Sequence, residues 1–321
     1  MQFQELQARA RLNESLARHT TSRIGGPADM LIEARSSDEL AALVQRADET
    51  GLPCLVMGSG ANILVADAGV RGLVIMNRSK ELKFNVSSVS ARVEADSGVA
   101  LVTLARDCIE RGLSGMEWAI GVPGTVGGAV VGNAGAHGLE VASNLHMAKI
   151  LPRGGGEPAY WTVRQLAYHY RTSALKRTSQ ADRPIVLNAL FDLKRDHRTN
   201  LERRAAEFTT QRKATQPPGA TIGSMFKNPP GDFAGRLIEA CALKGTRSGG
   251  AMISEKHANF FLNMGEATAD DVMALVTLAR QRVLDRFQIE LELEVELVGA
   301  WEGGAYGQTG HRQVIEGGAA S

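Results

Sequence analysis

Residues 121–138 read GVPGTVGGAVVGNAGAHG, and seven of the chain's 35 glycines fall within these eighteen positions. Glycine leaves backbone N–H groups uncovered and reaches backbone angles closed to other residues, so such a run lets the main chain close tightly on a ligand. A flexible linker would be polar, whereas this run contains four valines and a single proline. The run is therefore expected to be folded and to contact a bound cofactor.

A second glycine turn, GSGAN at residues 58–62, lies between two apolar, strand-like segments at 52–57 and 63–65. Its consecutive N–H groups are suited to a diphosphate. A Rossmann fingerprint would need these glycines to open a helix, but the chain returns directly to an extended segment, so we exclude that fold. One glycine turn alone is weak evidence for binding. The two segments together predict an elongated dinucleotide that lies between two lobes.

The size and charge of the chain favour small ligands. With 321 residues, 44% of them hydrophobic, the chain can bury one large core or two to three smaller ones, which indicates a multi-lobed globular protein. The formal net charge of +1 gives no general attraction to nucleic acid or to an anionic membrane, so neither is expected as a partner.

The three cysteines, Cys54, Cys108 and Cys241, stand alone in apolar surroundings, which indicates buried thiols in a reducing compartment. The N-terminal residues lack the apolar core of a signal peptide, and no apolar run is long enough to cross a bilayer. These features predict a cytoplasmic protein. The seven histidines show no paired-ligand spacing, so no metal site is expected.

Hydrophobic periodicity predicts an α+β fold. In the first half of the chain we expect a helix that begins after Ser36 and ends at Gly51, strands at 73–76 and 92–95, and a helix over 99–109. A polar stretch at 194–198 precedes a charged helix at 201–213 and marks a domain junction.

The C-terminal part is expected to contain a helix at 233–240, strands near Met252 and at 260–262, and a long helix from Asp270 to Phe287 that Thr268 caps. After residue 299 the periodicity is lost. We therefore divide the chain into a first lobe at 1–72, a second lobe at 73–195, a third domain at 199–299, and a disordered tail at 300–321.

Three further segments carry groups that could do chemistry. The motif GSMFKNP at 223–229 holds Ser224, whose hydroxyl could protonate a strongly basic carbanion in a closed site, and Lys227. The segment HYRTS at 169–173 offers Arg171, whose planar fork suits a carboxylate. From spacing alone, a turn cap, a surface amine and a salt-bridge partner remain the simpler interpretations of these side chains.

The third segment is IELELEVEL at 289–297, in which apolar and acidic residues alternate perfectly. A strand with this pattern places its apolar side chains on one face and its four carboxylates on the other. Stacked like charges repel each other, so a buried member would have a raised pKa unless a cation lies near. A solvated acidic face is the simpler interpretation.

In their order along the chain, these motifs resemble the family of UDP-N-acetylenolpyruvoylglucosamine reductases. The resemblance covers residues 12–299 and also includes the segments TSRIGGPA at 21–28, RLIEACALKG at 236–245 and SEKHANFFLN at 254–263. It implies a two-lobed FAD-binding fold of the vanillyl-alcohol-oxidase (PCMH) type, followed by an α+β substrate domain. The residues that it assigns to FAD are Arg23, Gly58, Ser59, Gly60, Ala61, Asn62, Pro123, Gly124, Thr125, Gly127, Gly128, Asn133 and Gly135.

The resemblance also implies a reaction: NADPH reduces FAD, and the reduced flavin then reduces the enolpyruvyl ether of UDP-N-acetylglucosamine to UDP-N-acetylmuramate, in peptidoglycan precursor synthesis. By motif match, Arg171 and Glu294 would stabilise the enolate, with Glu294 protonated or bridged, and Ser224 would protonate the carbon that bears the ether oxygen. Lys227 and Asn228 would meet the substrate diphosphate. The little room between Arg171 and the strand at 185–193 implies the shorter subclass, which lacks an extra tyrosine-bearing loop.

Several positions depart from this family's pattern. Serine is usual where Ala61 stands, arginine where Glu296 stands, methionine at Gly132, glycine at Ala242, and tyrosine or a similar residue at His137. One hydroxyl contact to the flavin diphosphate is thus missing, and the charge around Glu294 is altered. The alternatives are a flavoprotein oxidoreductase of the same fold that acts on a sugar or hydroxy acid, and a non-enzymatic flavin-binding or UDP-sugar-sensing module. Arg171, Ser224 and Glu294 argue against the second alternative.

Overall fold

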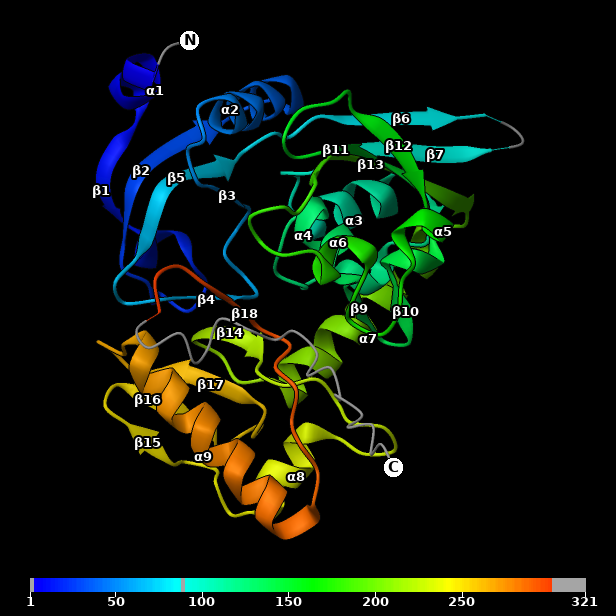
Figure 1. The fold of residues 1–321 in the computed structure, drawn as a ribbon. Coiled ribbons are helices and arrows are strands. Elements are labelled where there is room, and N and C mark those ends of the chain that lie inside the picture. Colours follow the sequence, from blue (N-terminus) through cyan, green and yellow to red (C-terminus); the bar gives the residue numbers. More distant parts are fainter. Residues whose placement is uncertain (1–2, 88–89, 302–321) are drawn as a thin grey trace, which may run out of the picture.

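The computed structural model describes residues 3–87 and 90–301, which form two lobes and a third domain below them (Figure 1). Helices and strands are mixed throughout, as an α+β fold requires. Each of the three parts has its own cluster of buried apolar side chains. The expected multi-lobed organisation is thus confirmed.

The first lobe is built on a four-stranded sheet in the order β1-β2-β5-β3, in which β2, β5 and β3 are parallel. Its elements are α1 (Phe3–Arg9), β1 (Arg11–Ser15), the 3-10 turn η1 (Leu16–His19), β2 (Pro27–Ala34), α2 (Ser37–Glu49), β3 (Cys54–Met57), β4 (Ile63–Val65) and β5 (Val70–Asn77). The α2 helix covers this sheet and also packs against the second lobe. It begins where Ser36 caps it, with the Ser36 hydroxyl accepting from the Glu39 N–H at 3.1 Å, as predicted.

The second lobe is built on an antiparallel sheet in the order β12-β11-β13-β7-β6, and β8 also pairs with β13. Its first elements are β6 (Leu82–Val86), β7 (Ala91–Asp96), α3 (Leu101–Glu110), β8 (Leu113–Ser114), η2 (Glu117–Ala119) and α4 (Val126–Gly132). They are followed by β9 (Gly135–Ala136), β10 (Leu139–Glu140), η3 (Val141–Ser143), β11 (Leu145–Leu151), β12 (Ala159–Thr162), α5 (Val163–Leu166), α6 (Ala174–Arg177) and β13 (Ile185–Arg195). The core of this lobe lies between the sheet and helices α3 and α4, around Trp118 and Phe191.

The third domain has a four-stranded antiparallel sheet in the order β14-β17-β16-β15, with α8 and α9 packed together beside it. Its elements are β14 (Ala220–Ser224), α8 (Ala234–Ala240), β15 (Arg247–Ser248), β16 (Ala251–Ile253), β17 (Phe260–Asn263), α9 (Ala269–Phe287) and β18 (Glu296–Val298). As predicted, Thr268 caps α9 and accepts from the Asp271 N–H at 3.0 Å. Apolar side chains that recur at helical spacing along α9 are buried in the core of this domain: Val272, Leu275, Val276, Ala279 and Val283.

Contacts from the first lobe hold the third domain in place. Strand β18 pairs in parallel with β4, so the segment that follows the third domain's last helix returns to the first lobe (Figure 1). The Asp67 carboxylate accepts from the N–H groups of Ala269 and Asp270, at 2.8 and 3.0 Å. An acidic group at this place also complements the positive end of the α9 dipole.

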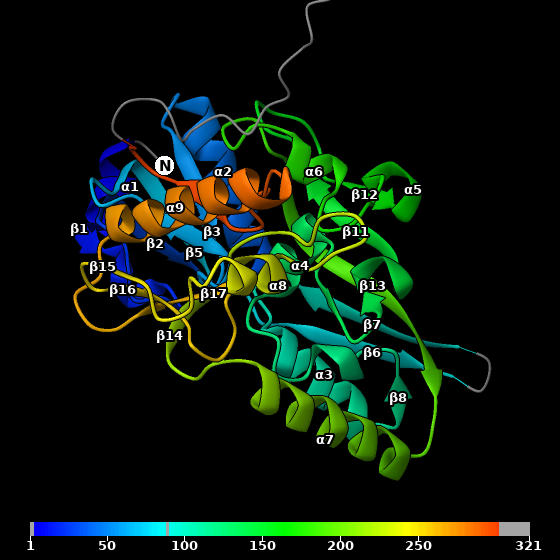
Figure 2. The same ribbon diagram turned by 90° about the horizontal axis from the view of Figure 1, so that it is seen from below.

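Two features differ from the expected domain division. Residues 73–77 were assigned to the second lobe, but they belong to β5, which pairs with β2 and β3 in the first sheet. The helix expected to open the third domain is α7 (Arg198–Thr215), and it packs on the second lobe beside α3 (Figure 2). Leu201 and Ala205 of α7 bury their side chains with Ile109 of α3, and that contact could not be read from the polarity of the helix.

The prediction of a strand over residues 289–297 was largely wrong. Only Glu296–Val298 form a strand, while residues 289–295 form none and make a single β-bridge, from Leu293 to Phe226. The alternation nevertheless reports burial correctly, because Leu291, Leu293 and Val295 are buried. Hydrophobic alternation thus predicts which side chains are buried, whether or not a neighbouring strand completes a ladder.

The expected disorder after residue 299 falls mostly outside the described residues. Of that segment, the Ala300 N–H donates to Gly69 O at 2.9 Å, and the Trp301 indole N–H donates to Val298 O at 3.1 Å. Ala242, at a position where glycine is usual in the family that the sequence resembles, has φ 57°. That left-handed conformation after α8 is the one that glycine favours.

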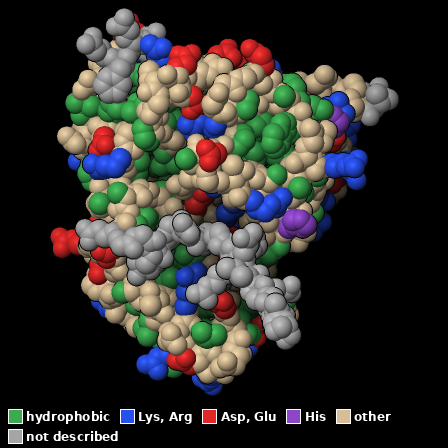
Figure 3. Space-filling view, in the orientation of Figure 1, with side chains coloured by type: hydrophobic (Ala, Val, Ile, Leu, Met, Phe, Trp, Pro, Cys, Tyr) green, Lys and Arg blue, Asp and Glu red, His purple; other side chains and the backbone are tan. Residues whose placement is uncertain are grey.

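No helix within residues 3–87 and 90–301 combines the length and the apolar character needed to span a bilayer. Lys, Arg, Asp and Glu side chains are spread over the face of the molecule shown in Figure 3. This mixture of signs agrees with the near-zero net charge of the sequence.

Candidate functional site

A cleft of about 640 Å³ lies where the two lobes and the third domain meet. Both glycine segments line it, and so do residues from the second lobe and from β14. Of the predicted site residues, those that line it are Gly58, Ser59, Gly60, Ala61, Asn62, Pro123, Gly124, Thr125, Gly127, Gly128, Gly135, Arg171, Ser224 and Glu294. The cleft thus collects most of the site that the sequence predicted.

The turn at 58–62 needs its glycines for different reasons. Gly60 has φ 64°, and a Cβ there would lie 2.3 Å from His19 O, so only glycine fits. A Cβ on Gly58 would lie 2.5 Å from the Thr125 hydroxyl, which shows that the two glycine segments touch each other. The Ser59 hydroxyl is buried and has no hydrogen-bond partner among the described residues.

The long glycine run opens α4. Gly127 is packed against the second lobe, since a Cβ there would lie 2.9 Å from Ser97 Cβ. Gly128 lines the cleft, and the nearest protein atom to an added Cβ would be Thr125 Oγ1, at 3.9 Å. One glycine therefore allows close packing of the protein, while the next leaves room in the cleft.

These features fit FAD. A buried, unpartnered hydroxyl at Ser59 and the adjacent backbone N–H groups match the acceptor oxygens of a diphosphate. The uncharged, glycine-lined wall on the α4 side leaves space for a flat ring system.

The end of α4 positions Arg171. The last carbonyls of the helix accept hydrogen bonds from the segment at 168–173, with the Tyr168 hydroxyl donating to Val130 O at 2.9 Å and the Ser173 hydroxyl to Val131 O at 2.6 Å. Asn133 is fully buried and left-handed (φ 47°), and its amide donates to His169 O at 3.2 Å. Asn133, predicted to bind the cofactor, is thus not among the described residues that line the cleft; it joins two motifs instead.

Arg171 sits in a tight two-residue turn between His169 and Thr172, with φ 55°. A left-handed arginine is uncommon and costs on the order of 1 kcal/mol, so the surrounding contacts must hold it. Its guanidinium donates to Gly135 O at 2.6 Å and to Asn133 O at 3.4 Å. Arg171 Nε lies 3.0 Å from Glu294 Oε1, so the structure brings together two residues that are far apart in the sequence.

Glu294 is contacted by all three parts of the molecule. Its N–H donates to Met225 O at 2.9 Å in the third domain, while its carbonyl accepts from Asn62 of the first lobe at 3.1 Å and from Lys176 of the second at 3.2 Å. Burial raises the pKa of the Glu294 carboxyl, although Arg171 and Lys176 favour its charged form. The Glu294 carboxyl is therefore paired with Arg171, and burial makes it easier to protonate than an ordinary glutamate.

Ser224 ends β14 and lines both this cleft and a second cavity of about 410 Å³ in the third domain. Its hydroxyl makes no hydrogen bond within the described residues, so it is free to serve a ligand. Asn228 lines only the second cavity, and its side chain accepts from the Ala234 N–H at 3.1 Å. Lys227 forms an ion pair with Glu292.

Arg23 is exposed and left-handed (φ 57°), and its carbonyl accepts from the Asn263 amide at 3.3 Å. Arg23, Lys227 and Asn228 are not among the described residues that line the larger cleft. Their proposed binding roles therefore rest on the motif match alone.

Sequence reasoning missed several polar side chains in the cleft. Lys176, Gln180 and Arg183 line it from the second lobe, and Arg212 lines it from α7. Burial lowers the pKa values of the Lys176 amine and the Arg212 guanidinium. None belongs to a motif with a mechanism of its own, so only a prediction of contacts between 174–183 and 294–298 could have revealed the first three.

His137, at a usual tyrosine position, also lines the cleft. Its ring stacks on Phe208 of α7 with 4.1 Å between the ring centroids, and its Nδ1 lies 3.1 Å from Gln211 Oε1. Burial lowers the pKa of this imidazole. An aromatic ring is therefore kept at this position.

Comparison with known proteins connects this site to one family. Residues 214–298 match the model of the UDP-N-acetylenolpyruvoylglucosamine reductase C-terminal domain, and residues 28–157 match that of an FAD binding domain. A UDP-N-acetylenolpyruvoylglucosamine reductase of Chloroflexus aurantiacus is 43% identical over 287 residues, which are 89% of this chain and 96% of that protein. One from Bacillus pumilus is 39% identical over 289 residues, covering 89% and 93%.

A solved structure agrees with these matches. The crystal structure of UDP-N-acetylenolpyruvylglucosamine reductase from Thermus caldophilus is similar with a TM-score of 0.74 and 36% identity, over 90% of this chain and 99% of that one. The similarity thus extends over both lobes and the third domain.

Proposed function

Because this chain belongs to the UDP-N-acetylenolpyruvoylglucosamine reductase family, it is an FAD-dependent oxidoreductase that reduces this enolpyruvyl substrate with NADPH, and we propose that Arg171, Ser224 and Glu294 carry out the chemistry on the substrate. The observation that carries the proposal is the contact of Arg171 with Glu294 in the cleft that Ser224 also lines. The domain limits given by the sheets are likewise proposed, with the first lobe ending at Asn77 and α7 belonging to the second lobe.

The turn at 58–62 and the run at 123–135 would hold the FAD, with Ser59 donating its free hydroxyl hydrogen to the diphosphate. When bound, FAD supplies hydride transfer between NADPH and the enolpyruvyl group. The protein's own task is to place the enolpyruvyl group between this wall and the polar residues at the other end of the cleft.

Arg171 and Glu294 meet the charge that develops on the substrate. Hydride addition at the terminal methylene carbon leaves negative charge that spreads into the substrate carboxylate as an enolate. Two hydrogen bonds and one ion pair use three of the five N–H groups of Arg171, and two remain for the substrate carboxylate. A protonated Glu294 would donate a further hydrogen bond, and its raised pKa favours that form.

Ser224 would complete the reaction by donating its proton to the carbon that bears the ether oxygen. A serine hydroxyl is a weak acid, but the acceptor is a strongly basic carbanionic centre, so geometry decides the transfer. The unpartnered Ser224 hydroxyl needs to break no contact within the described residues before it reacts.

Lys227 and Asn228 are our proposal for the residues that meet the substrate diphosphate. They follow Ser224 directly, and Asn228 lines the neighbouring cavity that Ser224 also borders. In the structure Lys227 is paired with Glu292, so diphosphate binding would exchange one anionic partner for another.

An anaerobic absorption spectrum of the purified protein tests this function. We expect NADPH to bleach a bound flavin and the enolpyruvyl substrate to restore its colour, with one equivalent of UDP-N-acetylmuramate formed. Bleaching by NADPH without recovery on adding that substrate would contradict the proposal and favour a different flavoprotein oxidoreductase of this fold.

We also propose that the protein acts in the cytoplasm, where NADPH and UDP-sugars are available. Its three cysteines are free, and burial raises the pKa of Cys54 to about 11 and that of Cys108 to about 12, which suits unreactive thiols in a reducing compartment. Cell fractionation with an antibody against the native protein would test this location, and recovery in a periplasmic or membrane fraction would contradict it.

A further inference from the structure

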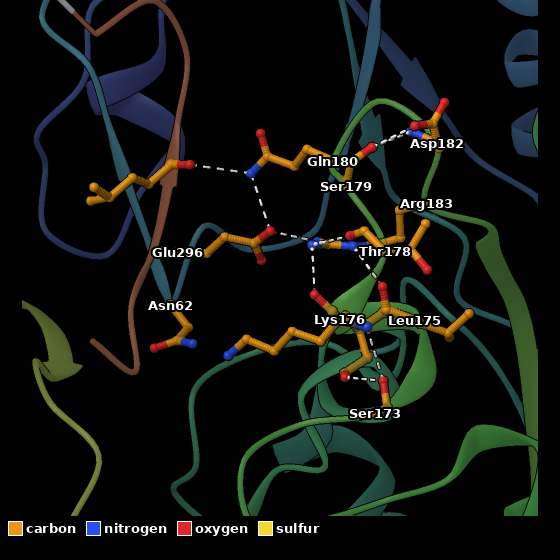
Figure 4. Close-up of polar contacts among 12 residues, drawn as sticks. Asn62, Ser173, Leu175, Lys176, Thr178, Ser179, Gln180, Asp182, Arg183 and Glu296 are labelled. Atoms are coloured by element: carbon orange, nitrogen blue, oxygen red, sulfur yellow. Dashed lines mark hydrogen bonds and ion pairs between the residues drawn. The ribbon is translucent and has the colours of Figure 1, made fainter. Parts of the chain in front are cut away.

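Glu296 stands where the family usually has arginine, and the structure shows which cation faces it. Arg183 Nη1 lies 2.6 Å from Glu296 Oε1, and the Gln180 amide donates to the same carboxylate oxygen at 3.1 Å (Figure 4). The side chains of Arg183 and Glu296 are only 16% and 23% exposed. The pair therefore belongs to the cleft and is not a solvated surface contact.

Arg183 contacts backbone carbonyls as well as the Glu296 carboxylate. Its guanidinium also donates to the carbonyls of Leu175, Lys176 and Thr178, at 3.1 to 3.4 Å, so it ties Glu296 to the end of α6 (Figure 4). The same short helix carries Lys176, whose amine donates to the carbonyl of Glu294. One planar cation thus connects the third-domain segment 294–298 with the second-lobe segment 174–183.

The connection matters because the third domain is fastened mainly to the first lobe on this side. The β4–β18 pairing and the Asp67 contacts to α9 both come from there. Across the cleft, the second lobe reaches the segment 294–298 through residues 171–183 alone among the described side-chain contacts: Arg171, Lys176, Gln180 and Arg183.

The charges of Glu294 and Glu296 are a second reason why the contacts of Arg183 matter. Only Val295 separates Glu294 from Glu296 in the sequence, and both glutamates line the cleft. The Lys176 amine interacts electrostatically with both carboxylates, and Arg183 is the cation paired with Glu296. Without Arg183, Glu296 would repel a Glu294 anion and compete for Lys176.

We propose that the Arg183–Glu296 ion pair, supported by Gln180, is a positioning device that holds Glu294 opposite Arg171 across the cleft. Arg183 and Glu296 act through Glu294, so the inference rests on the role proposed above for that residue. An arginine at position 296, usual in the family, would here face Arg183, so in this chain the cation comes from the second lobe instead.

The test compares Arg183→Gln, Glu296→Gln and the double variant as flavin-loaded proteins, with Arg203→Gln as a control. Arg203 forms an exposed ion pair of the same chemical type with Glu207 on α7, away from the cleft. Anaerobic stopped-flow absorption would measure flavin reduction by NADPH and flavin reoxidation by the enolpyruvyl substrate separately.

We expect each single variant to slow reoxidation by about tenfold to a hundredfold, since small displacements of a catalytic group have effects of this size. Flavin reduction should change less than threefold, roughly, because it does not use Glu294. The double variant should recover part of the loss, because neither charge is then left unpaired in the cleft. Arg203→Gln should match the wild type in both steps.

The pH profile of reoxidation separates positioning through Glu294 from a general structural role. The charged groups that act on Glu294 are Arg171 from the 169–172 turn, Lys176 from α6 and Lys227 after β14. Two residues further along the chain, Glu296 is paired with Arg183. The part of the pH profile that depends on Glu294 is the limb that Glu294→Gln abolishes. Arg183→Gln leaves Glu296 unpaired and should move this limb to higher pH. Glu296→Gln should move it to lower pH.

Wild-type reoxidation rates in both single variants would overturn the inference, as would equal slowing of both half-reactions, loss of bound flavin, or shifts of the pH limb in the same direction. Failure of the proposed function itself looks different, because then the wild-type protein would not be reoxidised by the substrate at all.

Discussion

The two ends of the cleft are built in different ways. The end proposed for the cofactor is made of backbone from two short glycine segments, Gly58–Asn62 and the run around α4, and each is contiguous in the sequence. The end proposed for the substrate is lined by charged and polar side chains that come from separate parts of the chain: Arg171, Lys176, Ser224 and Glu294. A backbone site needs small residues in a row, whereas a side-chain site needs only that distant residues meet in the fold.

This contrast has a chemical basis. The backbone N–H groups of the first end would hold the diphosphate of an FAD that stays bound, so this end can be uncharged and rigid. The substrate develops negative charge during the reaction, so the second end needs cations and a proton donor close to that charge. Substitutions at the two ends should therefore fail in different ways.

The largest effect is expected from Gly128→Val. A side chain there enters open cleft space with no protein atom nearer than 3.9 Å to its Cβ, so the protein should fold but exclude the flavin. The purified variant should be colourless, with helix content like that of the wild type by circular dichroism. Gly132, one helical turn later, also lines the cleft and has open space around an added Cβ, and the family usually carries methionine there, so Gly132→Met is the matched control and should stay yellow. A yellow Gly128→Val protein would remove that residue from the flavin contact surface.

At the other end, Glu294→Gln should bind flavin normally but slow its reoxidation by substrate about 100- to 1,000-fold, as loss of one charge-stabilising group does elsewhere. Stopped-flow absorption measures this. Equal slowing of the NADPH step would show that Glu294 serves both half-reactions.

The same variant makes a prediction about stability. Burial raises the folded-state pKa of Glu294 above its unfolded value of 4.5, so the folded protein is favoured while Glu294 is protonated and loses that advantage as pH rises through the raised pKa. Glutamine removes this dependence. The thermal midpoint of Glu294→Gln should therefore exceed that of the wild type at pH 8, and the gain should disappear below about pH 4. An unchanged difference at both pH values would show that Glu294 has no raised pKa.

A smaller effect is expected from Ser59→Ala at the cofactor end. Loss of one hydrogen bond to the diphosphate should weaken FAD binding by about five- to tenfold, or about 1 kcal/mol. Titration of the apoprotein with FAD, followed by flavin fluorescence, measures the dissociation constant. No change would mean that the unpartnered Ser59 hydroxyl does not meet the cofactor.

Ala61→Ser should have the smallest effect, in the opposite direction. It restores the hydroxyl that relatives usually carry and should tighten FAD binding by about two- to fivefold. Weaker binding would show that the turn has no room for this hydroxyl.

Much of the fold could be predicted because its signals are local. Ser36 before α2 and Thr268 before α9 cap their helices in the structure, and the apolar stripes of both helices are buried. Such caps and periodicities depend on residues within one or two turns of each other. The positions of these helices followed directly.

The features that could not be predicted depend on which distant parts of the chain pack together. The polar surface of α7 did not reveal that Leu201 and Ala205 pack on the second lobe, and the alternation at 289–297 did not reveal that only Glu296–Val298 find a strand to pair with. The sequence also did not reveal that Asn133, a predicted cofactor-binding residue, holds the 168–173 segment to the end of α4. Tertiary contacts decide all three.

The candidate site shows the same division. Its glycine segments could be found from composition, whereas Lys176 and Arg183 carry no signal until the fold brings them to Glu294 and Glu296. The resemblance to a family supplied Arg171, Ser224 and Glu294, and the structure then showed that the first and third form an ion pair.

The most direct test of the central claim, that the cleft separates a cofactor end from a substrate end, is the effect of Ser224→Ala on the two half-reactions. Ser224 lies at the substrate end and would donate its proton only after hydride transfer. In anaerobic stopped-flow experiments, flavin reduction by NADPH should proceed at nearly the wild-type rate, while reoxidation by the enolpyruvyl substrate should slow by about 100- to 10,000-fold. Equal slowing of both steps, or reoxidation at the wild-type rate, would contradict the account.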